Sequence, residues 1–70
     1  MSFNYLTWTD SELLEEADER ELNTVESEML NSMMTAAGLD KLTHTTMRPL
    51  TPRQRAWLER LLHSTHPARD

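Results

Sequence analysis

The sequence predicts an all-α fold, a small bundle of three short helices at about 10–21, 24–37 and 52–64. Two observations predict it. Each segment begins with a capping box, a pair of side chains three residues apart that bond the first free backbone N–H groups of a helix. Each then places apolar residues at the three- and four-residue spacing of one helix face. The chain also has a single glycine, which argues against a β-rich fold with many tight turns.

The first helix is expected to begin after Thr9, which forms a capping box with Glu12. Trp8 before the cap and Leu13 after it are placed to form a hydrophobic staple. The residues expected to face inward are Leu13, Leu14 and Ala17.

The second helix is expected to begin at Asn23 or Thr24, with Glu26 completing a capping box. Its apolar residues fall on one broad face: Val25, Met29, Leu30, Met33, Ala36 and Ala37. Gly38 predicts a left-handed helix end, with Leu39 folding back on the last turn as in a Schellman motif. Core packing is expected for Met29 and Met33, whereas Leu30 and Met34 could face a partner.

Residues 40–50 are poor helix material, because they contain three threonines and the residue before Pro49 is disfavoured in a helix. We expect an extended connection with a short turn at about 40–42. The third helix then begins at the capping box of Thr51 and Gln54, with Pro52 at its first position. Its apolar stripe is Trp57, Leu58, Leu61 and Leu62, and a flexible tail is expected at 65–70.

Seventy residues predict one domain, residues 1–70, with a core that supplies about 3–5 kcal/mol of stability. The chain has no cysteine and therefore no disulfide to add to it. The predicted second helix is apolar across nearly half its circumference. Together these features predict a homodimer.

Several function classes are disfavoured. The N-terminal residues resemble no signal peptide, and no apolar run is long enough to span a membrane, so we expect a soluble cytoplasmic protein. The sequence has no glycine-rich phosphate loop and no nucleophile motif, which predicts that it is not an enzyme and needs no cofactor. His63 and His66 are three residues apart, but Pro67 ends the helix there and no further ligand completes a metal site by spacing.

Four carboxylates of the predicted first helix share one face: Glu12, Glu15, Glu16 and Glu19. We call them the acidic face. Like charges four residues apart destabilise a helix, so this crowding needs a reason. It is either a solvated surface, favoured near the helix N-terminus by the dipole, or a surface that binds a basic patch on a larger protein. Tyr5, Trp8 and Met34 are candidate anchors for such a partner.

The charge is divided between the two parts of the chain. Residues 1–40 hold ten acids and one arginine, a net of −9, whereas residues 41–70 hold six basic residues and two acids, a net of +4. This division predicts attraction between the halves or two surfaces with different partners.

The alternative function is a small DNA-associated regulator that contacts phosphates through Arg53, Arg55 and Arg60 around Trp57, although the chain's overall acidity disfavours it. A structural subunit of a larger assembly is a third possibility.

The run DSELLEEADERELNTVESEML at residues 10–30 resembles a pattern of very small phage-encoded accessory proteins. In that pattern an acidic helix of the form D-x-E-L-L-x-x-A leads through a threonine cap to a second helix. The matching residues here are Asp10, Glu12, Leu13, Leu14, Ala17, Thr24, Glu28 and Leu30, with Ser27 in place of a glutamate. The segment LTPRQRAWLERLL at residues 50–62 is similar to the terminal helices of such proteins. The resemblance implies a protein that binds a host protein and inhibits or redirects it, and it carries no site residues across.

Overall fold

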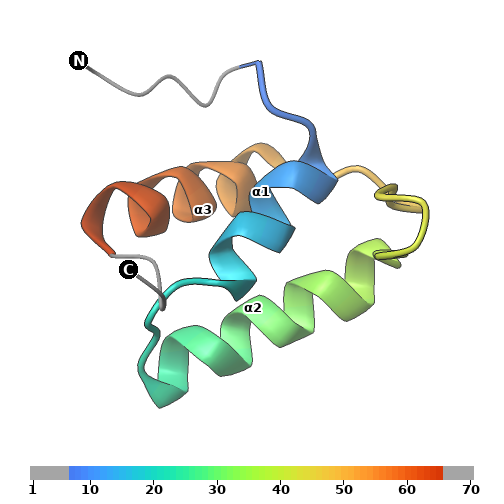
Figure 1. The fold of residues 1–70 in the computed structure, drawn as a ribbon. Coiled ribbons are helices and arrows are strands. Elements are labelled where there is room, and N and C mark those ends of the chain that lie inside the picture. The colour runs from blue at the N-terminus through green and yellow to red at the C-terminus, as the bar shows by residue number, and fades with distance from the viewer. Residues whose placement is uncertain (1–6, 66–70) are drawn as a thin grey trace.

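A computed structural model describes residues 7–65, and it folds these residues into three α-helices (Figure 1). They are α1 (Asp10–Asp18), α2 (Thr24–Ala37) and α3 (Pro52–Ser64). Helix α1 packs against both other helices, whereas α2 and α3 barely contact each other. The described residues include no strand, so the predicted all-α fold is confirmed.

All three predicted helix starts are confirmed, because each N-cap side chain and its partner three residues later bond each other's backbone N–H. The backbone N–H of Thr9 donates to the Glu12 carboxylate at 2.8 Å. The N–H of Glu26 donates to the Asn23 side chain at 2.8 Å. Pro52 stands in the first turn of α3, where no donor is lost.

Helix α1 ends at Asp18, three residues earlier than predicted. The chain must reverse direction before α2, and Asn23 already has the extended backbone of an N-cap. Residues 19–22 supply this reversal. The side chain of Arg20 crosses to the end of α3 and donates to the backbone oxygen of Thr65 at 2.9 Å, a contact that no local pattern predicts.

The end of α2 follows the predicted Schellman motif. Gly38 has a φ of 66°, and its N–H donates to the oxygen of Thr35 at 3.2 Å. The N–H of Leu39 donates to the oxygen of Met34 at 3.1 Å. A left-handed φ at this position favours glycine over any residue with a Cβ.

The connection between α2 and α3 is less extended than predicted. Asp40 and Thr45 exchange backbone hydrogen bonds of 2.8 and 3.3 Å, which close a turn longer than the one expected at 40–42. His44 at the end of this turn has a φ of 58°. The hydroxyl of the buried Ser11 donates to the oxygen of His44 at 2.6 Å and holds the turn against α1. Because this turn is held by a side chain of α1, its shape could not be predicted from residues 40–50 alone.

The core lies where the three helices meet: Leu13, Leu14, Ala17, Leu30, Met33, Ala37, Leu50, Leu58, Leu61 and Leu62. All three residues predicted to face inward from α1 are in it. For α2 the prediction was partly wrong. Met29 is 43% exposed and Val25 is 64% exposed, while Leu30, considered as a partner contact, is buried. The inward face of α2 is narrower than its apolar face because α2 packs mainly on one neighbour, α1.

Among residues 7–65, no helix has both the length and the apolar character to cross a membrane.

Candidate functional site

The acidic face lies on the side of α1 that points away from the core. Leu13, Leu14 and Ala17 are buried between α2 and α3, so the helix period directs Glu12, Glu15 and Glu16 outward, and Glu19 follows them at the C-cap of α1. Glu12 and Glu19 are exposed. The side chains of Glu15 and Glu16 retain 26% and 31% exposure.

Contacts within the chain explain how α1 tolerates this crowding. His44 Nδ1 lies 2.9 Å from Glu15 Oε1, and Arg20 Nη2 lies 3.1 Å from Glu16 Oε2. Beside them, Lys41 Nζ lies 2.8 Å from Asp18 Oδ2. These groups come from the turn after α1 and from the connection after α2. The carboxylates are therefore partly neutralised, and their side chains are held in place.

Two carboxylate contacts on this surface shift pKa values: the helix cap between Thr9 and Glu12, and the ion pair between Asp18 and Lys41. The backbone N–H of Thr9, and next its hydroxyl, lower the pKa of the Glu12 carboxyl, because both bond the charged form. The hydrogen bond and then the charge of Asp18 raise the pKa of the Lys41 ammonium. Both shifts favour the ionised forms at neutral pH.

A shallow hollow of about 210 Å³ lies within this surface, lined by Glu15, Asp18, Glu19 and Lys41. Three carboxylates and one ammonium leave it negative. Its size and charge suit one basic side chain.

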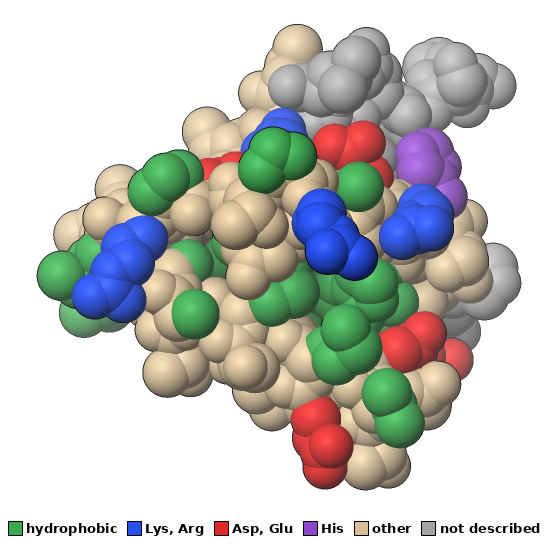
Figure 2. Space-filling model, turned by 180° about the vertical axis from the view of Figure 1, so that it is seen from behind, with side chains coloured by type: hydrophobic (Ala, Val, Ile, Leu, Met, Phe, Trp, Pro, Cys, Tyr) green, Lys and Arg blue, Asp and Glu red, His purple; other side chains and the backbone are tan. Residues whose placement is uncertain are grey.

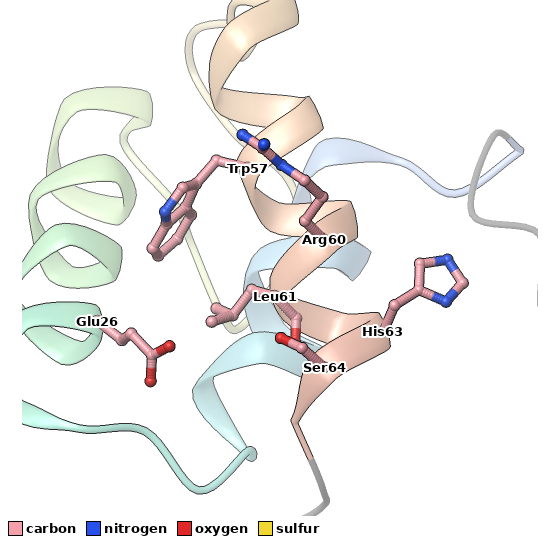
Figure 3. Close-up of a pocket in the computed structure, with 6 residues that line it drawn as sticks. All are labelled: Glu26, Trp57, Arg60, Leu61, His63 and Ser64. Carbon is pink, nitrogen blue, oxygen red and sulfur yellow. The ribbon is translucent and has the colours of Figure 1, made fainter.

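The opposite side of the molecule carries a groove between α2 and α3. Figure 2 shows hydrophobic side chains gathered on this side, with basic side chains above them and acidic ones below. Two adjoining hollows make up the groove, one of about 390 Å³ and one of about 610 Å³. The first is lined by Met29, Ser32, Met33, Arg53, Gln54, Trp57 and Arg60, and the second by Glu26, Trp57, Arg60, Leu61, His63 and Ser64. In Figure 3, Trp57 and Leu61 point from α3 toward α2, while His63 points away.

The three arginines of α3 do not form one cluster. Arg55 contacts the start of α1, with Nη1 donating to Asp10 Oδ1 at 2.8 Å and Nη2 donating to the oxygen of Trp8 at 2.6 Å. Arg53 and Arg60 are exposed at the groove and have no hydrogen bond or ion pair among the described residues. The predicted set of phosphate contacts is therefore reduced to two residues beside Trp57.

The candidate anchors have different positions. Tyr5 lies outside the described residues, as does His66. Trp8 and Met34 are half-buried against the core, so neither is a free anchor.

Within the described part of the chain, no group of three or more His, Cys, Asp or Glu side chains could hold a metal ion.

The groove was not predicted as a site. The signal for it was present in α2, where Val25 and Met29 lie to one side of the line formed by Leu30, Met33 and Ala37. Only the tertiary packing shows that this edge stays uncovered.

In comparison with known proteins, no family model, curated protein or solved structure matches this chain.

Proposed function

We propose that this chain is a non-catalytic protein-interaction module that binds a basic surface of a larger protein through its acidic face. The observation that carries the proposal is the outward position of Glu12 and Glu15 on α1 and of Glu19 at its C-cap. Residues 12–21 contain six acids and one arginine, Arg20, which pairs with Glu16, while Lys41 pairs with Asp18. The surface therefore keeps an excess of negative charge.

The internal contacts support binding as well as stability. Because His44 and Arg20 hold the carboxylates of Glu15 and Glu16, a partner has less side-chain entropy to remove when it binds. A lysine or arginine of the partner can enter the hollow beside Lys41. Exposed charge of one sign also steers a partner of opposite charge and speeds association, an effect that salt weakens.

The resemblance of residues 10–30 to phage accessory proteins extends the proposal to a setting. We propose that the partner is a host protein in the cytoplasm, which the bound module inhibits or redirects. The chemistry of the acidic face limits that partner to one with an exposed cluster of lysines or arginines.

Binding of nucleic acid at the groove is the second candidate, because Arg53 and Arg60 lie exposed beside Trp57 and have no ion pair within residues 7–65. Two phosphate contacts on a chain of net charge −5 supply little affinity. We expect no binding of fluorescent single-stranded DNA at low salt, measured by anisotropy. Binding that weakens steeply with added salt would favour this candidate.

The test of the acidic face is affinity capture from a bacterial lysate with identification by mass spectrometry. Three proteins are compared: the wild type, a Glu15→Gln, Glu16→Gln, Glu19→Gln variant, and an Arg53→Gln, Arg60→Gln variant that changes the groove instead. Far-UV circular dichroism establishes that each is folded. We expect one captured protein whose yield falls about tenfold or more in the glutamine-for-glutamate variant. Equal capture by that variant, or loss only in the arginine variant, would contradict the proposal.

A further inference from the structure

The carboxylate of Glu15 belongs both to the hollow of the acidic face and to a contact with a histidine. It lines the hollow of about 210 Å³ together with Asp18, Glu19 and Lys41. Its two oxygens also lie 2.9 and 3.1 Å from Nδ1 of His44, in the turn that follows α2. The charge that Glu15 presents to the hollow therefore depends on the charge of His44.

Contacts of the backbone hold His44 beside α1 whatever the charge of its ring. Its φ of 58° lies in the left-handed region, and its carbonyl oxygen accepts a hydrogen bond of 2.6 Å from the hydroxyl of Ser11. The backbone hydrogen bonds between Asp40 and Thr45 close the turn around it. The side chain of His44 is 69% exposed, so its ring can exchange protons with solvent while the backbone stays in place.

The other charged groups around this imidazole come from α1, from α3 and from the turn itself. Asp10 of α1 and Arg55 of α3 line a hollow of about 430 Å³ with it, and they pair with each other at 2.8 Å. In the turn, Lys41 pairs with Asp18 of α1, and the Asp40 carboxylate accepts a backbone N–H of the same turn at 2.9 Å. Among carboxylates, lysine, arginine and histidine, only histidine ordinarily changes its charge between about pH 5 and 8.

We infer that protonation of His44 regulates the acidic face by weakening its affinity for a basic partner. A neutral ring can donate one hydrogen bond to Glu15 and leaves the negative charge of that carboxylate uncompensated. A protonated ring places a positive charge 2.9 Å from Glu15 Oε1 and turns the contact into an ion pair. A lysine or arginine that enters the hollow then meets a neutralised pair instead of a full negative charge.

The coupling between proton and partner acts in both directions. A bound cation disfavours the charged ring, because two positive charges beside one carboxylate repel each other. Binding of a basic partner therefore releases protons wherever His44 is partly protonated in the unbound chain, and the affinity falls as the pH falls. This regulation rests on the proposed function, since it acts on the same binding surface.

The test is the affinity of the full chain for a fluorescent oligolysine peptide, measured by anisotropy at low salt between about pH 7.5 and about pH 5.5. The dissociation constant should rise about threefold or more as the pH falls, as expected for one charge added close to the bound cation. His44→Asn keeps a residue type that tolerates a left-handed backbone but cannot be charged, so its dissociation constant should rise less. Calorimetry in two buffers of different ionisation enthalpy should detect proton release by the wild type and less release by His44→Asn.

His63→Asn is the matched control, because it removes an exposed histidine that lines the groove and not the hollow of the acidic face. It should keep the pH dependence of the wild type. Circular dichroism at both pH values establishes that each variant is folded. An unchanged pH dependence in His44→Asn would overturn this regulation while the proposed function stands. Absence of binding by the wild type at the higher pH, or equal binding by the Glu15→Gln, Glu16→Gln, Glu19→Gln variant, would contradict the proposed function and the regulation with it.

Discussion

At the scale of single residues, Asp10 joins three parts of the chain. Its Oδ1 accepts a hydrogen bond of 2.8 Å from Arg55 of α3, and its Oδ2 accepts one of 2.9 Å from the backbone N–H of Leu50. The two side chains of the ion pair retain only 21% and 24% exposure. From the sequence, Asp10 is simply an acid in the first turn of a helix. In the fold it positions the start of α1 against the start of α3.

Replacing Asp10 with alanine should therefore lower the free energy of unfolding by about 2 kcal/mol, because it removes the carboxylate that accepts from Arg55 Nη1 and from the backbone N–H of Leu50 in a partly buried position. Urea denaturation measures the change. Asp18→Ala is the control, since it removes a more exposed ion pair with Lys41 and should cost about 0.5 kcal/mol or less. Equal losses in the two variants would contradict the assigned role of Asp10.

The capping carboxylate of Glu12 makes stability depend on pH. Its pKa is lower in the folded chain than its ordinary value of 4.5, because Thr9 bonds the charged form. A lowered folded pKa adds stability above the unfolded value, and this stability is lost as pH falls through the folded pKa. The expected loss therefore lies below about pH 4.5.

Urea denaturation of the wild type and of Glu12→Gln between about pH 7 and about pH 3 measures this contribution, since the reference titration of a glutamate lies within that range. Glutamine keeps an acceptor for the Thr9 N–H but cannot titrate. The stability difference between the two proteins should shrink as the pH falls. A difference that stays constant with pH would exclude Glu12 as its source.

At the scale of elements, the apolar face of α2 is wider than the strip of that helix that is buried in the core. Leu30, Met33 and Ala37 enter the core, whereas Val25 and Met29 stay exposed at the edge. The pattern of apolar residues identifies the side of the helix that faces inward. The width of the buried strip depends on how many neighbours α2 has, and α1 provides most of its contacts.

The two methionines of α2 provide the test. Met33 is 7% exposed and Met29 is 43% exposed. Met33→Ala should lower the free energy of unfolding by about 2–3 kcal/mol through lost burial and a cavity. Met29→Ala should cost less than about 1 kcal/mol when both variants are compared at a concentration where the chain is monomeric. Reversed magnitudes would show that the core lies elsewhere on α2.

At the scale of the whole molecule, the charge division seen along the chain becomes a set of contacts and two separate surfaces. Asp10–Arg55, Glu15–His44 and Asp18–Lys41 each join the acidic first part of the chain to the basic second part. The charges left over gather on opposite sides. Excess acid lies on the outer side of α1, and Arg53 and Arg60, the arginines of α3 with no ion pair in the described part of the chain, lie at the groove.

The fold class, the three helix starts, the end of α2 at Gly38 and most of the core can all be predicted from the amino-acid sequence. The physical reason is that these features depend on short-range chemistry. A capping box joins residues three apart, a left-handed glycine ends a helix locally, and an apolar stripe follows from the helix period.

The end of α1, the choice between the methionines of α2 as core residues, and the exposure of Arg53 and Arg60 on α3 depend instead on how the helices pack. Arg20 reaches Thr65 and Arg55 reaches Asp10, each across 45 residues of chain. Such contacts depend on how α2 and α3 pack around α1, and no local pattern encodes that packing. The acidic face could be predicted because one helix carries it, whereas the groove could not, because it exists only between two helices that both pack on a third.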